Sequence, residues 1–129
     1  MIAIQNLATS SSTRHLRPFN VYKDLNQVAD LVEQCFAETL DQDGRTYLQQ
    51  MRSAAHNPLY LRWAASMGES VGMPLSGYVW EEGGEIVGNL TLIPFNISSK
   101  RYYLIANVAV HPNYRMRGIA RDLTQAALE

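Results

Sequence analysis

The sequence has little cysteine, little net charge and no long apolar run. Its 129 residues include one cysteine, Cys35, which excludes an internal disulfide and favours a reducing, cytoplasmic setting. The formal net charge of −1 gives no general reason to expect nucleic acid or a membrane surface as a partner. No run approaches the roughly 20 apolar residues of a membrane-spanning helix.

The apolar fraction of 47% is that of an ordinary globular domain. Residues 1–13 have neither a basic start nor a long apolar core, so they do not resemble a signal peptide. We interpret them as a flexible N-terminal tail. Residues 14–129 are then expected to form one domain, because no linker, repeat or low-complexity run interrupts them.

The first half of the chain predicts a strand and then helices. Residues 14–21 are expected to form a short strand that Pro18 confines to an edge or a bulge. Asp24 is expected to cap a helix over residues 25–40, with Gln27 in the capping-box position.

Two more helical patterns follow. The first runs through Tyr47, Leu48, Met51 and Ala55, and the second begins at Pro58. Asn57 is expected to cap the second of these helices.

From Ser76 the pattern changes to strands. Residues 76–82 and 85–95 are expected to form a hairpin around a Gly-Gly turn. Pro94 is expected to end the regular pairing or to mark a bulge, and residues 96–100 to form a loop. Residues 101–110 are apolar on both faces, which predicts a central strand.

A final helix is expected to begin near Arg117 or Gly118. The link into it combines basic and small residues. Gly118 and Ala120 leave room for a phosphate to approach the unpaired N–H groups of the helix N-terminus. Arg115 and Arg117 add local positive charge. These residues alone predict a pyrophosphate-binding turn and do not identify the ligand.

Residues 107–123, NVAVHPNYRMRGIARDL, resemble the GNAT (GCN5-related N-acetyltransferase) superfamily. Its members have a strand similar to V-A-V-x-P-x-Y-R, then R/Q-x-x-G-x-G/A, then a helix. Ala120 replaces the commoner glycine. The resemblance implies an α+β, three-layer fold with a mixed, mainly antiparallel sheet and flanking helices. The C-terminal strands and helix of that fold are missing, so residues 14–129 would form an incomplete domain.

The resemblance also implies acetyl-CoA as cosubstrate, with no metal. The implied cofactor-binding residues are three on the strand edge, for the pantetheine arm, and six in the turn, for the pyrophosphate: Val108, Ala109, Val110, Arg115, Met116, Arg117, Gly118, Ile119 and Ala120. A backbone amide at the bulge of that strand would face the thioester carbonyl.

No catalytic residue is assigned. An amine must lose a proton and the departing thiolate must gain one. In many relatives a tyrosine beyond the motif helix supplies the second proton. For the base, Glu81, Glu82 and His111 are the available titrating groups nearby in the sequence, and each is interpreted as an ordinary exposed residue.

The aromatic side chains of the expected strands have two readings. Tyr78, Trp80 and Tyr102 are candidates for lining an acceptor site. Cross-strand packing is the favoured interpretation for each.

The sequence therefore predicts an N-acetyltransferase that moves an acetyl group from acetyl-CoA to a primary amine by direct attack, inactive as this fragment alone. A non-catalytic, CoA-binding regulatory module is the alternative, and a structural domain with no ligand is a third. The acceptor stays open among a protein N-terminus, lysine, polyamine, antibiotic and small amine. The open edge of strand 102–110 predicts a homodimer or larger assembly.

Overall fold

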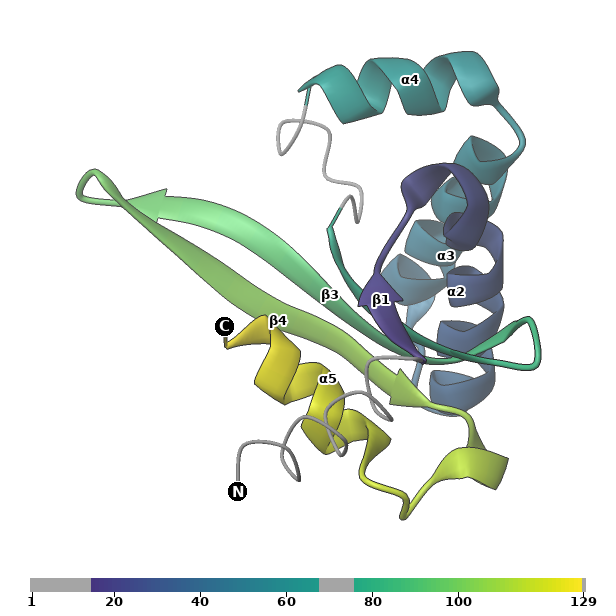
Figure 1. The fold of residues 1–129 in the computed structure, drawn as a ribbon. Helices are drawn as coiled ribbons and strands as arrows, with labels where there is room; N and C mark the ends of the chain where they lie inside the picture. Colours follow the sequence, from purple (N-terminus) through teal and green to yellow (C-terminus); the bar gives the residue numbers. More distant parts are fainter. Residues whose placement is uncertain (1–14, 68–75, 129) are drawn as a thin grey trace.

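The computed structural model describes residues 15–67 and 76–128 (Figure 1). The expected tail at residues 1–13 lies outside these ranges. The elements follow the predicted order of one strand, three helices, three strands and a helix, with a short 3₁₀ turn added: β1 (Leu16–Pro18), α2 (Val21–Phe36), α3 (Gln42–Ala55), α4 (Pro58–Met67), β2 (Gly77–Glu82), β3 (Glu85–Ile97), β4 (Lys100–Val110), η2 (Pro112–Tyr114) and α5 (Ile119–Ala127).

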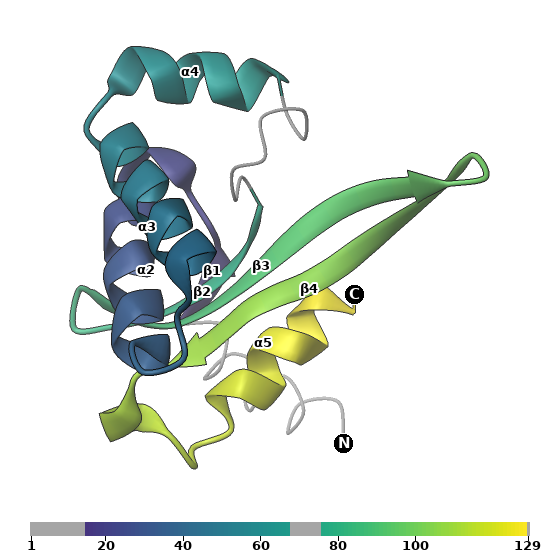
Figure 2. The ribbon, with the colours of Figure 1, turned by 180° about the vertical axis from the view of Figure 1, so that it is seen from behind.

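The four strands form one sheet in the order β1-β2-β3-β4, and each neighbouring pair is antiparallel. Val79 packs with α2 and α3 in one apolar core. Its neighbour Trp80 packs with Ile119 and Leu123 of α5 in a second core. Because successive side chains of a strand point to opposite faces, α5 covers one face of the sheet and α2 and α3 the other (Figures 1 and 2). The three-layer α+β fold is confirmed.

The start of α2 differs from the prediction. Asn20, in an extended conformation, is the N-cap, and its side-chain oxygen accepts a hydrogen bond from the Tyr22 N–H at 2.9 Å. The prediction that Asp24 is the cap of a helix over residues 25–40 is therefore wrong. The Asp24 carboxylate instead accepts the N–H of Asn20, one turn earlier, at 2.7 Å. Gln27 accepts the N–H of Ile86 on β3 at 3.2 Å and does not serve a capping box.

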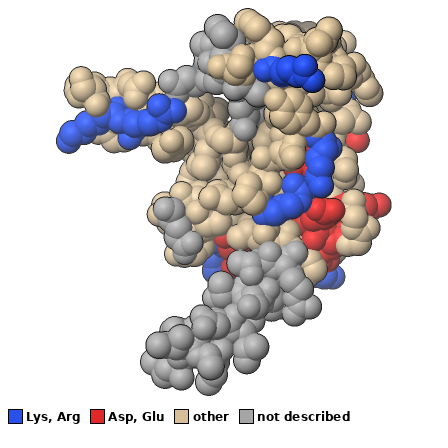
Figure 3. Space-filling model, turned by 45° about the horizontal axis from the view of Figure 1, so that its top comes forward, with Lys and Arg blue, Asp and Glu red and all other residues tan. Residues whose placement is uncertain are grey.

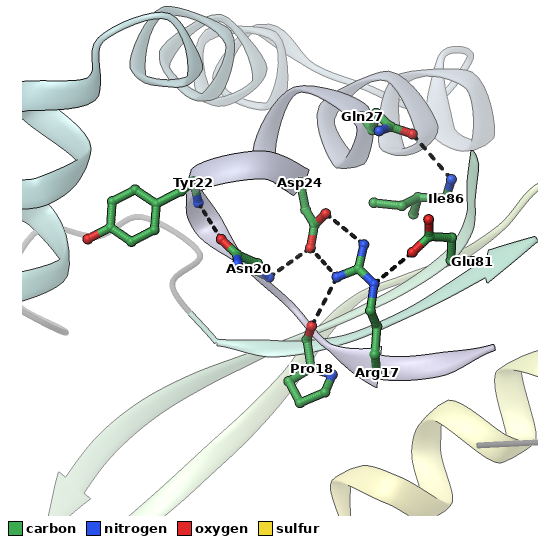
Figure 4. Close-up of polar contacts among 8 residues, drawn as sticks. All are labelled: Arg17, Pro18, Asn20, Tyr22, Asp24, Gln27, Glu81 and Ile86. Atoms are coloured by element: carbon green, nitrogen blue, oxygen red, sulfur yellow. Dashed lines mark hydrogen bonds and ion pairs between the residues drawn. The ribbon is translucent and has the colours of Figure 1, made fainter. Parts of the chain in front are cut away.

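Arg17 joins β1 to α2 and β2 (Figure 4). Its guanidinium donates to both carboxylate oxygens of Asp24, at 2.7 and 2.9 Å, and to Glu81 at 2.7 Å. The Asp24 side chain is 1% exposed. The hydrogen bond to Asp24 is the main cause that raises the pKa of Arg17 above its usual value. The consecutive elements β1 and α2 therefore meet β2, which is distant from both in the sequence, at one charged cluster.

The next two helices agree with the predictions. Asp41 caps α3 by accepting the N–H of Gly44 at 2.8 Å. Pro58 begins α4, and Asn57 accepts the N–H of Tyr60 at 3.0 Å, as expected of a cap. None of the helices within residues 15–67 and 76–128 has both the length and the apolar character needed to cross a membrane.

The hairpin of β3 and β4 is longer and more exposed than predicted. Pro94 stays inside the ladder, opposite Tyr103, so the prediction that it ends or interrupts the pairing is wrong. Leu92 donates its N–H away from β4, to Ser76. Pro94, two residues on, therefore lacks its N–H on the side that faces no strand among the described residues. Pairing continues to Ile97 and Lys100, so the expected loop at residues 96–100 shrinks to a two-residue turn.

β4 is an edge strand of the described sheet, so the prediction of a central strand from its apolar faces is wrong, whereas the expected open edge is present among the described residues. Residues 102–105 are apolar or aromatic, yet all are exposed, because the far half of the β3–β4 ribbon projects from the body (Figure 1). Basic atoms gather at its far end, where β4 begins with Lys100 and Arg101 (Figure 3). Self-association through this edge stays a prediction. The positive charges of Lys100 and Arg101 at the tip would disfavour strand pairing at that end.

Gly88 allows α5 to lie close to the sheet. A Cβ at this position would lie 2.9 Å from Ile119 Cγ2 and 3.3 Å from Leu123 Cδ1. Gly88→Ala is expected to lower the free energy of unfolding by about 1–3 kcal/mol, since α5 must move away. The loss should be smaller in an Ile119→Ala background, which removes the colliding methyl group. Urea unfolding of the four proteins measures the coupling, and additive effects would contradict this account.

Candidate functional site

A cavity of about 350 Å³ lies between the edge of β4, the turn after it and the end of α2. It collects all of the predicted cofactor-binding residues except Arg117. Four residues that the sequence did not indicate also line it: Cys35, Phe36, Tyr114 and Arg121.

The end of β4 turns backbone groups toward this cavity. His111 donates its N–H to Val87 of β3 at 2.8 Å. Because pairing alternates along an antiparallel ladder, the N–H and C=O of Val110 point to the other, open side. The Val110 carbonyl there accepts from the Cys35 thiol at 3.3 Å and from Arg115 Nε at 2.9 Å. This edge offers the Val110 N–H to a ligand.

A bulge interrupts β4 just before this point. The register with β3 shifts between Asn89 and Thr91, and Asn107 adopts a left-handed conformation with φ of 53°. The buried Asn89 side chain donates to the Asn107 carbonyl at 3.0 Å and to the Thr91 hydroxyl at 3.3 Å. A fully buried amide therefore fixes the bulge, which disrupts regular pairing beside Val108.

The turn presents the N-terminus of α5 to the cavity. Met116 and Gly118 have φ of 67° and 80°, so the chain reverses sharply before Ile119. Gly118 is the N-cap and supplies no side-chain hydrogen bond. The first helical bond runs from the Asp122 N–H to the Gly118 carbonyl at 2.9 Å. The N–H groups before Asp122 point out of the helix end, as in anion-binding sites.

Three arginines surround the turn in different ways. Arg115 is bonded to the Val110 carbonyl, and the Arg117 guanidinium lies 5.0 Å from the centre of the Tyr114 ring. Arg121 lies against Gly118, since a Cβ there would be 2.8 Å from its Nη2. Side chains on a helix lean toward the N-terminus of the helix. The position of Arg121, three residues after Gly118, was therefore the signal in the sequence that its guanidinium reaches the turn.

The candidate bases do not line this cavity. Glu81 is paired with Arg17. Glu82 accepts from Trp80 Nε1 at 3.1 Å. His111 Nδ1 accepts the N–H of Asn113 at 3.1 Å.

The aromatic side chains of the strands pack as the favoured interpretation predicted. Trp80 is buried and stacks on His15, and Tyr78 packs against the same core. Tyr102 stacks on Phe95, its cross-strand partner, at 5.6 Å between ring centres. None of the three lines the cavity.

Solved structures share this fold. A GCN5-related N-acetyltransferase from Ralstonia eutropha superimposes with a TM-score of 0.60 at 26% identity, over 88% of this chain and 72% of the other. A predicted acetyltransferase from Clostridium acetobutylicum, solved with acetyl-CoA, gives 0.60 at 16% identity, over 88% and 70%. An aminoglycoside acetyltransferase from an uncultured soil sample, in complex with sisomicin, gives 0.57 at 17% identity, over 88% and 66%.

A comparison with curated proteins yields no match. The description of the acetyltransferase (GNAT) family, in contrast, matches residues 25–129, which include every described helix and strand except β1 and the first turn of α2. The chain therefore belongs to the GNAT family of acetyltransferases.

Proposed function

We propose that the chain is an acetyltransferase domain that binds acetyl-CoA and serves transfer of the acetyl group to a primary amine by direct attack. The inactivity of residues 1–129 alone stays a prediction. One observation carries the proposal. A single cavity has the open backbone edge of β4 on one side and the uncapped N-terminus of α5 on the other. The first suits an amide-bearing arm and the second suits a phosphate.

The residues present fit this cosubstrate. The pyrophosphate would lie on the N–H groups at the start of α5, where Gly118 and Ala120 add almost no side-chain bulk. Arg121 and Arg117 would add positive charge around it. The Val110 N–H would donate to an amide carbonyl of the pantetheine arm. The thioester would then lie near the bulge at Asn107.

Bound acetyl-CoA supplies an acetyl group on a thioester carbon that a neutral amine nitrogen can attack. The C–N bond forms as the C–S bond breaks, and the proton lost by the amine balances the charge of the thiolate. The chain's own residues would bind acetyl-CoA, orient its thioester and stabilise the charge that develops during the attack. A backbone N–H released at the bulge would donate to the oxygen that gains charge during attack.

The alternative of a CoA-binding regulatory module has one observation in its favour. Neither Glu81, Glu82 nor His111 lines the cavity. Two measurements separate the alternatives. Calorimetry should detect acetyl-CoA binding in both cases, whereas release of free CoA thiol on adding primary amines is expected only of the transferase. Absence of acetyl-CoA binding would refute both.

The three arginines are expected to respond differently to salt. Arg121→Ala and Arg117→Ala should weaken CoA binding about three- to tenfold at low ionic strength and less at high salt, because screening removes charge attraction. Arg115→Ala should cause a loss that salt changes little, since Arg115 also holds the Val110 carbonyl. Calorimetry at two salt concentrations measures this. Arg62→Ala, on α4 and away from the cavity, is the control, and equal salt dependence in all four variants would contradict the assignment.

A further inference from the structure

A second cavity, of about 300 Å³, adjoins the first at the β4 bulge. Both cavities are lined by Phe36 and Val108. A molecule held in the second cavity would therefore reach β4 beside the place where the thioester is proposed to lie.

The wall of the second cavity is mainly apolar. Its apolar side chains come from α2, the turn after it, α3 and β4: Val32, Phe36, Leu40, Leu48 and Val108. None of the described residues that line it carries a charge at neutral pH. A second ammonium group of a ligand would find no carboxylate here, and burying it unpaired would be costly.

Tyr47 gives this cavity its one titratable group among the described lining residues. Burial raises the pKa of the Tyr47 hydroxyl, and a side-chain hydrogen bond with Asn107 opposes that rise. The hydroxyl therefore keeps its proton at neutral pH and remains a hydrogen-bond donor. Asn107 is the bulge residue whose carbonyl Asn89 holds. Tyr47 and this bulge residue line the same cavity.

We propose that this cavity receives the uncharged apolar group of the acceptor, so that the substrate class is a monoamine with a compact aromatic or branched aliphatic group. Tyr47 is the residue that positions this group beside the bulge. The inference rests on the proposed transferase function and narrows the class of amine that the transferase would accept. Polyamines and aminoglycosides, which carry several positive charges, are then poor acceptors.

The test uses the full chain saturated with CoA, which binds without turnover, and two amines. Calorimetry should show 2-phenylethylamine binding about tenfold or more tightly than 1,4-diaminobutane, because its ring buries apolar surface. Tyr47→Phe keeps the ring and removes the hydroxyl, and it should weaken 2-phenylethylamine several-fold with CoA affinity unchanged. Leu40→Asp should reverse the order of the two amines, since it places a carboxylate in the wall. Urea unfolding confirms that both variants are folded.

The outcomes separate the two proposals. CoA affinity is measured first, and no binding would overturn the proposed function together with this inference. Normal CoA binding with diaminobutane bound as tightly as phenylethylamine would overturn the inference alone. An unchanged phenylethylamine affinity in Tyr47→Phe would overturn the role given to Tyr47. Reversal by Leu40→Asp, with the wild-type preference intact, supports the cavity as the acceptor site.

Discussion

Gly118→Val is expected to abolish CoA binding, with a loss of affinity above about a hundredfold, while the domain stays folded. Gly118 has φ of 80°, a conformation that costs a branched L-residue about 1–2 kcal/mol. The new Cβ would also lie 2.8 Å from the Arg121 guanidinium. The side chain would both displace that charge and occupy the approach to the α5 N-terminus. Calorimetry with CoA measures the loss.

Gly84→Val is the matched control. Gly84 also has φ of 80°, but it lies in the turn between β2 and β3, and a Cβ there meets nothing within 4 Å. Both variants should therefore lose similar stability in urea unfolding, whereas only Gly118→Val should lose CoA. Retained CoA affinity in Gly118→Val would refute the pyrophosphate site. Loss of CoA in both variants would attribute the effect to general destabilisation.

The sequence predicted the kinds and order of the elements because their periodicities are local. The start of α2 could not be predicted in the same way. Both Asn20 and Asp24 are common cap residues, and the choice between them depends on Arg17 of β1. Arg17 binds Asp24 from outside the helix, a contact that no local pattern shows.

The β3–β4 ribbon shows a different limit of prediction from the sequence. An apolar strand usually indicates burial, and residues 102–105 are exposed because no described element covers them. The two-residue turn between β3 and β4 was not predicted, because Ser98 and Ser99, at φ of 52° and 67°, are not the Asn-Gly pair typical of such hairpins. The sheet neighbours of a strand are set by tertiary structure, so the pattern alone cannot distinguish an edge from a centre.

The candidate site also has one part that the local sequence indicates and another that depends on tertiary packing. The turn from Arg115 to Ala120 is one continuous segment, and its glycine, alanine and arginines indicate their chemistry directly. Cys35 and Phe36 reach the cavity from α2, and Tyr47 reaches the adjoining cavity from α3. Their positions depend on how the helices pack on the sheet. The sequence therefore indicated the end of the cavity that is proposed to hold the phosphate, and not the wall that would face the acceptor.

Asp24→Ala is expected to lower the free energy of unfolding by about 3–5 kcal/mol, the range for breaking a buried ion pair by removing one partner. The Asp24 side chain is 1% exposed, and it satisfies both the Arg17 guanidinium and the Asn20 N–H. Its removal leaves a partly buried positive charge whose remaining partners among the described residues are Glu81 and the Pro18 carbonyl. Urea unfolding, with the slope compared between variants, measures the loss.

Asp30→Ala on the same helix provides the comparison. Asp30 is paired with Arg52, but its side chain is 59% exposed, and exposed ion pairs contribute about 1 kcal/mol or less. The two variants remove the same chemical group from α2, so the difference between them isolates the effect of burial. Equal losses would mean that the Arg17 cluster does not hold β1 and β2 to α2. A much larger loss in Asp24→Ala means that the edge of the sheet and the helix beside the cavity proposed to bind acetyl-CoA are stabilised together.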